Sequence, residues 1–295
     1  MQNISADDSN EQYISNKVRD IQDCSNVKGQ TTDRAPGLET IVVKIGGSTL
    51  GNHDTTLSDV VELHKQGKNV VVVHGGGKII SEWMQRQGVR PKFVNGLRVT
   101  DHASFEIVVA VLTGLINKNL VASLISMKGK AIGMSGADNS LLTAKIRSAD
   151  LGLVGDVIRV EIESLTTLLE SGFIPVVAPI GISHHEGQDS RPTLLNINAD
   201  TAAGEIAAAL NSRQLIFLTD VEGVLDTSRR LIPRLTEKQA SKLISSKVAA
   251  GGMIPKLEAC VRSLESGGHA QIIDGRKPMA LVDAIAGKAI GTRIG

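Results

Sequence analysis

The chain has 295 residues, of which 41% are hydrophobic and 2% aromatic, and its formal net charge is +1. This composition is that of a globular protein with a large core in one or two domains, and it lacks the basic face and stacking rings of a nucleic-acid-binding protein. The two cysteines, Cys24 and Cys260, are too few for a disulfide framework, which indicates a reducing, cytoplasmic setting.

The first 37 residues form a polar extension that ends in the linker-like sequence DRAPG. The extension contains no apolar stretch of the kind that a signal peptide needs, and its early acidic residues are not typical of a transit peptide. Ile14, Val18 and Ile21 recur at helical spacing and allow a short amphipathic helix. Because a helix with three apolar residues is marginal in water, we expect the extension to be disordered in isolation.

From Thr40 onward, apolar strands that end in glycine alternate with helical patterns. In the first half, strands are expected at 40–47, 69–77 and 131–136, helices at 56–67, 78–88 and 102–127, and a helix–glycine–strand unit at 163–180. In the second half, an irregular polar excursion at 181–200 is followed by a helix at 199–211, a strand with glycine at 214–226, helices within 236–246 and 251–268, and a strand at 269–275. Continuous Val and Ile runs are typical of parallel strands whose two faces are both covered.

These elements predict an α/β fold, a three-layer αβα sandwich with a mainly parallel central sheet and two lobes. The lobes are expected at about 38–180 and about 181–295 on one continuous sheet, after the extension at 1–37. In open parallel sheets, ligands bind at the carboxyl ends of the strands. The glycine clusters fall at these ends, so we expect the functional site there.

A run of valines leads directly into His74, three glycines and Lys78. A P-loop would need Ser or Thr after the lysine, where this chain has Ile79, and a dinucleotide fingerprint would need a third glycine, where it has Ile80. The glycines at 75–77 therefore predict an anion cradle of another class, although a tight strand-to-helix turn also explains one or two of them.

Lys44 lies inside an apolar strand, just before Gly46 and Gly47. A buried lysine needs an anionic partner or a shifted pKa, which makes it costly without a function. The glycines expose backbone N–H groups beside the cation, an environment suited to a phosphate or a developing oxyanion. The alternative is a lysine that reaches solvent from an edge strand.

Three further segments carry candidate site residues. Arg98 lies in an apolar loop, and its guanidinium suits a carboxylate. Asn196, Asn198 and Asp200 stand at the mouth of a helix, where we interpret Asn198 as the N-cap. Lys256 lies just inside a helix that follows a glycine pair. Two lysines, two glycine clusters and one aspartate form the electrostatic set that phosphoryl transfer requires.

Six motifs occur in the order KIGGS, HGGG, NGLRVTD, LNINAD, LTDVEGVLD and GGMIPK. Together, over about residues 40–295, they resemble the amino acid kinase family. The motif NGLRVTD is similar to that of the members that use ATP to phosphorylate the side-chain carboxylate of N-acetyl-L-glutamate, a step of arginine biosynthesis. The resemblance implies ATP and N-acetyl-L-glutamate as partners, with Mg²⁺ carried by the nucleotide and no metal site of the protein's own. It also implies a homodimer, and leaves open whether the extension links dimers into a hexamer.

The resemblance further implies a role for each matching residue. Lys44 and Lys256 would stabilise the transferred phosphoryl group, and Asp200 would hold both lysines. The other assignments are Gly46 and Gly47 along the phosphoryl path, Gly76 and Gly77 at the carboxylate that is phosphorylated, Arg98 at the substrate's α-carboxylate and Asn196 at its acetamido group. The nucleotide would lie in the lobe at 181–295, against Asp220, Val221, Glu222, Gly223, Val224, Leu225, Val248, Ala249 and Ala250, and the amino-acid substrate in the lobe at 38–180.

Two alternative functions stay open at this point. One is a kinase for a related acylated amino acid, such as carrier-bound aminoadipate, although NGLRVTD argues against it. The other is a non-catalytic amino-acid sensor. A sensor would have lost at least one lysine of the set or Asp200, and Lys44, Lys256 and Asp200 are all present.

Two segments depart from the pattern of the family. The polar loop at 183–192 is longer than usual, and we expect its His184 and His185 to belong to an exposed loop and not to a metal site. Near the end of the chain, Ala284 stands where the family has an acidic residue that binds the effector arginine, and one helical step turns the neighbouring Asp283 away by about 100°. The segment HAQIIDGRKP at 269–278 resembles the start of the family's arginine pocket, so the two signals conflict. Because the acidic residue is missing, we expect weak or no inhibition by arginine.

Overall fold

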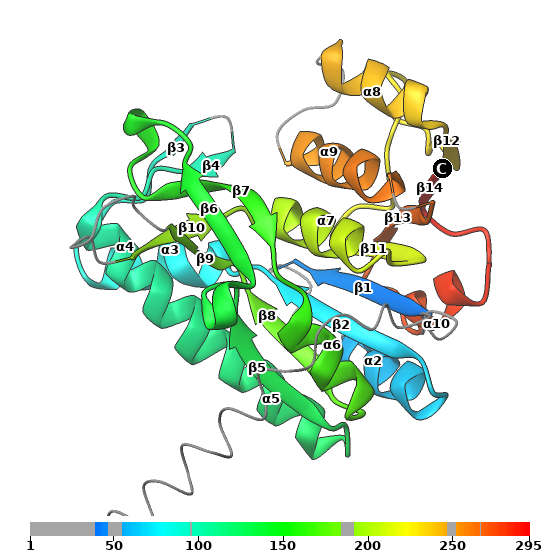
Figure 1. Cartoon of the computed structure of the whole chain (residues 1–295). Coiled ribbons are helices and arrows are strands. Elements are labelled where there is room, and N and C mark those ends of the chain that lie inside the picture. The colour runs from blue at the N-terminus through cyan, green and yellow to red at the C-terminus, as the bar shows by residue number, and fades with distance from the viewer. Residues whose placement is uncertain (1–38, 47–54, 95, 184–191, 247–251, 266) are drawn as a thin grey trace, which may run out of the picture. The chain divides into compact units, whose positions relative to one another are not determined.

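The computed structural model describes residues 39–46, 55–94, 96–183, 192–246, 252–265 and 267–295. The amphipathic helix expected in the extension and most of the polar loop at 183–192 lie outside these residues. Within them, helices cover both faces of one large sheet (Figure 1).

The central sheet has eight strands. Their order is β12 (Arg234–Leu235), β14 (Thr292–Ile294), β13 (His269–Asp274), β11 (Gln214–Thr219), β1 (Thr40–Ile45), β2 (Asn69–His74), β8 (Ile174–Ala178) and β5 (Ala131–Ser135). Neighbouring strands run parallel except β13 and β14, so the expected mainly parallel sheet is confirmed. Ile45 of β1 lies level with His74 of β2 and Leu218 of β11, which brings the carboxyl ends of these three strands to one edge.

Alternate side chains of the strands point to opposite faces and build two separate cores. Val43 and Val72 belong to the core on one face, and Val42 and Val73 to the core on the other. The first core includes α2 (Thr56–Lys65), α3 (Gly77–Arg86), the long helix at 102–126 and α10 (Ala280–Ile285), and the second includes α6 (Glu163–Glu170), α7 (Ala199–Ala209), α8 (Glu237–Ser245) and α9 (Met253–Leu264). This is the three-layer arrangement that the sequence predicts.

The long helix at 102–126 is continuous but not regular. It consists of α4 (His102–Val109), the π-helical segment η2 (Ala110–Ile116) and α5 (Asn117–Ser126), where the sequence predicts one regular helix. Its length and composition would suit a membrane span, yet Val108, Leu112 and Leu124 pack into the core against the sheet. It is therefore a core helix, as its polar interruption indicates.

A second, smaller sheet is absent from the prediction. β6 (Leu142–Ile146), β7 (Val154–Val160), β9 (Ile180–Ser183) and β10 (Thr193–Ile197) close into a small barrel. The prediction of an irregular segment at 181–200 is therefore wrong at both ends of that segment, because β9 and β10 are regular strands that pair in antiparallel orientation. β10 buries only alternate residues, Leu195 and Ile197, and lacks the continuous apolar run that marks the central strands. The remaining described elements are the hairpin of β3 (Phe93–Val94) and β4 (Leu97–Arg98) and the 3₁₀ turns η3 (Asp138–Ser140) and η4 (Ala149–Leu151).

Candidate active site

Asp200 holds the two candidate lysines together at the carboxyl edge of the sheet. Lys44 Nζ lies 2.7 Å from Asp200 Oδ1, and Lys256 Nζ donates to Asp200 Oδ2 at 2.9 Å. Lys44 comes from β1, Asp200 from the first turn of α7 and Lys256 from the first turn of α9. Residues far apart in the chain thus form one cluster, in the pairing that the resemblance implies.

The charges of this cluster depend on its burial. Lys44 is 7% exposed and Asp200 6%. Burial acts to raise the pKa of Asp200, but the charges of Lys44 and Lys256 outweigh it and hold the pKa below its usual value. Burial lowers the pKa of Lys44, and Lys256 adds to this lowering while Asp200 opposes it. Two ammonium groups that share one carboxylate form a site that attracts a further anion.

The start of α7 explains how Asp200 is placed. Asn198 Oδ1 accepts hydrogen bonds from the backbone N–H groups of Asp200 at 2.8 Å and Thr201 at 3.1 Å. The interpretation of Asn198 as an N-cap is therefore confirmed. The cap fixes the first turn of the helix, and with it the direction in which the Asp200 carboxylate leaves the backbone.

The contact between α7 and α9 brings Asp200 to Lys256. A Cβ atom on Gly204 would lie 2.8 Å from both Cα and Cβ of Ala259, so the two helices touch directly at this glycine. Asp200 lies about one turn before Gly204, and Lys256 about one turn before Ala259. A larger side chain at 204 would separate the helices and, with them, the ion pair.

The glycines at 75–77 serve two different purposes. A Cβ atom on Gly76 would lie 2.4 Å from Ile116 Cδ1 and 2.9 Å from Leu112 Cδ2, whereas a Cβ atom on Gly77 would meet no atom of the described residues within 4 Å. Gly76 is thus required by close packing against the long helix, which is the turn explanation that the sequence leaves open. Gly77 opens α3, whose first N–H groups have no acceptor within the helix and lie at its positive end. That geometry suits an anion.

A cleft of about 200 Å³ lies between the lysine cluster and these glycines. Its lining includes Lys44, Gly76, Gly77, Arg98, Asn196 and Asp200, all of which the sequence nominates. Gly46 lies at the end of β1, where its N–H donates to Leu218 O at 3.2 Å and extends the strand pairing. Gly47 lies outside the described residues.

Arg98 is buried in β4, and not in a loop as the sequence suggests. Its Nη2 donates to Gly77 O at 2.8 Å and Ser81 Oγ at 2.9 Å, and its Nη1 to Met84 Sδ at 3.0 Å. The guanidinium also lies 4.7 Å from the centre of the Phe93 ring. These hydrogen bonds use three of its five N–H groups and leave two for a ligand, as far as the described residues show. Burial lowers the pKa of Arg98 below its ordinary value.

Thr100 connects Asn196 with Arg98, and the sequence does not nominate it. Asn196 Nδ2 donates to Thr100 Oγ1 at 3.1 Å, and Thr100 Oγ1 donates to Arg98 O at 2.9 Å. Thr100 is fully buried. Its place in the motif NGLRVTD, two residues after the arginine, is the signal that could have identified it.

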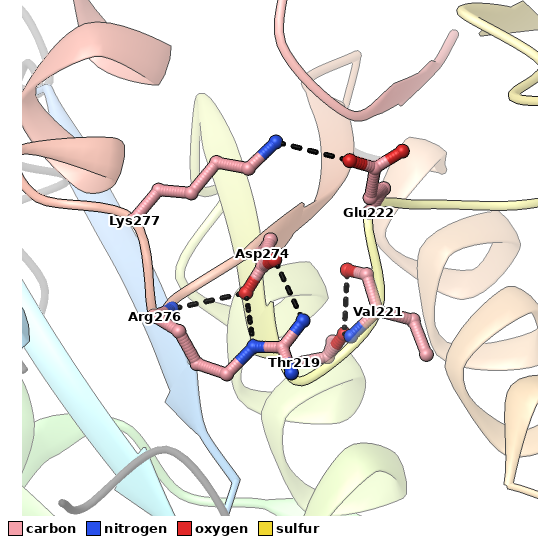
Figure 2. Close-up of polar contacts among 6 residues, drawn as sticks. All are labelled: Thr219, Val221, Glu222, Asp274, Arg276 and Lys277. Carbon is pink, nitrogen blue, oxygen red and sulfur yellow. Dashed lines mark hydrogen bonds and ion pairs between the residues drawn. The ribbon is translucent and has the colours of Figure 1, made fainter.

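The segment proposed for the nucleotide begins where β11 ends, and Figure 2 shows its contacts. Thr219 Oγ1 accepts from Val221 N at 3.0 Å and donates to Val221 O at 3.1 Å, which forms a tight turn. Lys277 Nζ lies 3.2 Å from Glu222 Oε1, and Arg276 pairs with Asp274 through two 2.8 Å bonds (Figure 2). The sequence does not nominate Arg276 and Lys277 for the nucleotide, and the pair of Lys277 with Glu222 connects the segment after β13 with the segment after β11.

The far end of the same segment is anchored by Thr292. Val224 N donates to Thr292 Oγ1 at 2.8 Å, and a Cβ atom on Gly223 would lie 2.6 Å from that oxygen. The φ of Gly223 is +149°, which a larger residue rarely adopts. Val221 and Leu225 are 38% and 41% exposed and offer apolar contact at the surface. Val248, Ala249 and Ala250 lie outside the described residues.

The family model described as the amino acid kinase family matches residues 39–274, so the chain belongs to this family. Among curated relatives, the acetylglutamate kinase of Dehalococcoides mccartyi (strain BAV1) is 41% identical over 254 residues, which cover 86% of this chain and 93% of that protein. The acetylglutamate kinase of Thermoanaerobacter pseudethanolicus is 44% identical over 267 residues and 87% of both proteins. The solved structure of smu.665 from Streptococcus mutans UA159 is 32% identical with a TM-score of 0.73, over 87% of this chain and 98% of that one.

Proposed function

We propose that this chain is a kinase that uses ATP to phosphorylate the side-chain carboxylate of N-acetyl-L-glutamate, in arginine biosynthesis. The acetylglutamate kinases at 41% and 44% identity support this substrate pair. The observation that carries the proposal is a cleft lined by Lys44 and Asp200 on one wall and by the start of α3 beside Arg98 on the other. Asp200 also holds Lys256, the second lysine of the cluster, at 2.9 Å. The first wall suits a phosphoryl group in transfer, and the second suits an acidic substrate.

In the proposed reaction, an oxygen of the substrate's side-chain carboxylate forms a bond to the γ-phosphorus of ATP. The bond from this phosphorus to the β–γ bridging oxygen breaks, and ADP leaves, so the product is an acyl phosphate. Little covalent work falls to the protein in such a transfer; it positions the reactants and stabilises their charge. Lys44 and Lys256 are preorganised for this role because Asp200 holds each by a separate oxygen.

The substrate's carboxylates are assigned to separate groups of the cleft. Gly76 and Gly77, at the positive end of α3, would receive the carboxylate that is phosphorylated. The two remaining N–H groups of Arg98 suit the α-carboxylate. Asn196, oriented by Thr100, would bind the acetamido group.

The nucleotide is assigned to the segment from Asp220 to Leu225 and to residues 248–250, in the lobe at 181–295. Mg²⁺ prefers oxygen ligands and usually enters kinase sites on the phosphates of the nucleotide, whose charge it screens. We include Mg²⁺ in this form, and the described residues contain no group of three or more His, Cys, Asp and Glu side chains that could hold a metal ion.

An ADP-release assay with full-length protein, ATP and Mg²⁺ tests the proposal. We expect turnover with N-acetyl-L-glutamate, and little or none with glutamate or aspartate, which lack the acetamido group. Hydroxylamine would trap the acyl phosphate as a hydroxamate and confirm the atom that is phosphorylated. Turnover that requires a carrier-bound aminoadipate instead would favour the related kinase, and no turnover with any of these acceptors would overturn the proposal.

A further inference from the structure

His74 is fully buried at the end of β2, directly before the glycines at 75–77. Its Nδ1 lies 3.1 Å from Gly75 O, and its Nε2 lies 3.2 Å from Asn117 Nδ2. A carbonyl oxygen only accepts, so Nδ1 carries the proton, and Nε2 accepts from the Asn117 amide. Burial lowers the pKa of His74 to about 4, and the charges of Lys44 and Lys118 act in the same direction. The ring is therefore neutral at physiological pH.

Asn117 connects three strands of the sheet at this edge and is 1% exposed. Besides His74 on β2, its Nδ2 donates to Val176 O on β8 at 2.8 Å and lies 3.3 Å from Met134 O on β5. Because carbonyl oxygens only accept hydrogen bonds, these two neighbours identify the atom of the Asn117 amide that faces them as the nitrogen. A Cβ atom on Gly133 would lie 2.0 Å from Asn117 Oδ1, so the sheet leaves space at that glycine for this side chain.

The π-helical segment η2 determines that Asn117 faces the sheet. Along the long helix, the buried pair at 107–108 is followed four residues later by the pair at 111–112, and five residues later by the pair at 116–117. A regular helix would bury position 115 in this turn, but Leu115 is 37% exposed. The wider turn adds one residue and moves Asn117 inward, and π-turns of this kind often occur at functional sites.

The hydrogen bond from His74 orients the peptide between Gly75 and Gly76. The peptide is planar and trans, so its N–H points opposite to its carbonyl. Because the Gly75 carbonyl faces the His74 ring, the Gly76 N–H points away from the ring. Gly75 and Gly76 both line the cleft. The state of the imidazole is thus coupled to the direction of a backbone donor in the proposed substrate cradle.

We propose that Asn117 is a positioning residue for the substrate carboxylate. It holds His74 in the neutral form protonated on Nδ1, His74 holds the Gly75 carbonyl, and the Gly76 N–H keeps the direction needed to bind the carboxylate. This inference rests on the proposed function and adds to it a residue more than forty positions away from the cradle in the chain.

Kinetics of Asn117→Leu test the inference, because leucine has a similar shape and no donor. Removal of one preorganised hydrogen-bond donor typically lowers turnover about 100-fold to 1000-fold, and a donor that is present but misdirected should cost less. We therefore expect kcat/KM for N-acetyl-L-glutamate to fall about tenfold or more, and the KM for ATP to stay within about twofold. Leu124 is also fully buried on the long helix, so Leu124→Ala is the matched control. This variant should lose stability but keep the wild-type kcat/KM for N-acetyl-L-glutamate and the wild-type KM for ATP. A combined His74→Leu and Asn117→Leu variant loses no more than the worse single variant if both act through one path. Wild-type kinetics in Asn117→Leu, or additive losses in the combined variant, would overturn the inference.

A second measurement does not depend on activity. ¹⁵N NMR of the histidine rings in full-length protein, with His74 assigned by its substitution, reports which nitrogen carries the proton. We expect the Nδ1–H form in the wild type and a mixture of forms in Asn117→Leu. An Nε2–H or charged ring in the wild type at pH 7 contradicts the inference. If the NMR result holds while N-acetyl-L-glutamate is not phosphorylated, the proposed function fails and the hydrogen-bond path stands.

Discussion

At the scale of single residues, the main feature of the molecule is a pair of cations held by one buried carboxylate. We expect Lys44→Ala and Lys256→Ala each to lower turnover about 100-fold to 1000-fold, with a much smaller effect on the KM values, because each cation faces charge that develops during transfer. Lys68→Ala is the control, since the ion pair of Lys68 among the described residues is an exposed one with Glu39 at 3.0 Å. Steady-state kinetics that place either active-site variant within a few-fold of wild type would remove that lysine from the proposed mechanism.

We expect the interaction of Arg98 with the substrate to stabilise the bound substrate and the transition state equally. We predict that Arg98→Ala raises the KM for N-acetyl-L-glutamate about tenfold or more and leaves the KM for ATP nearly unchanged, because a charge-assisted pair is lost at a carboxylate remote from the reacting atoms. Arg147→Ala, which removes an exposed pair with Asp156 at 2.9 Å, is the matched control. An equal rise in the KM for ATP would place Arg98 in the nucleotide site or in folding instead.

His74 makes stability depend on pH. Its pKa is lowered from 6.5 to about 4 by burial, so between these values the unfolded chain binds a proton that the folded chain does not. The free energy of unfolding therefore falls as the pH drops through this window, by on the order of 3 kcal/mol from this group, and changes no further below it. Urea unfolding of wild type and His74→Asn from pH 7 to pH 4 measures the difference. We expect a shallower slope for His74→Asn, whose side chain does not titrate, and parallel slopes would contradict the lowered pKa.

At the scale of elements, the site depends on how individual helices begin. Asn198→Ala removes the cap of α7, and we expect it to cost about 1 kcal/mol of stability and to lower turnover, because the capped N–H groups include that of Asp200. Thr236→Ala is the matched control, since it removes the cap of α8, where Thr236 Oγ1 accepts from Gln239 N at 3.3 Å. Both variants should lose similar stability in urea unfolding. Only Asn198→Ala should lose turnover, and equal turnover in the two variants would mean that the cap does not position Asp200.

The elements themselves are predictable from the sequence to different degrees. The strands β1 and β2 and the helices α7 and α9 carry strong local signals, namely continuous apolar runs, glycine ends and a capping asparagine. The barrel strands carry weak local signals, because each is only four to seven residues long and none contains the continuous buried apolar run of the central strands. The π-turn at 110–116 has no local signal, since it arises where the helix must pack against Gly76 and the sheet together.

At the scale of the whole molecule, the predictions concern feedback by arginine and assembly of the subunits. The family resemblance predicts an effector site for arginine near α10, but Ala284 there is buried and uncharged, and Asp283 already pairs with Lys288 at 2.7 Å. We therefore predict weak or absent inhibition, because a guanidinium without its carboxylate loses roughly tenfold or more in affinity. Titration of arginine in the ADP-release assay tests this.

Light scattering of full-length protein and of a variant without residues 1–37 tests whether the extension links dimers. Inhibition at micromolar arginine that disappears with the extension would contradict the prediction.

The sequence by itself determines the α/β class and the parallel core of the sheet, and it nominates most residues of the candidate site but not Thr100, because these follow from local periodicity, glycine positions and the cost of burying Lys44. It does not determine how these residues meet. The contact of Gly204 with Ala259 decides that Lys256 reaches Asp200, and the π-turn decides that Asn117 reaches His74. Both depend on how helices pack against neighbours that are distant in the chain, and packing of this kind is a property of the folded surfaces, which no short window of sequence contains.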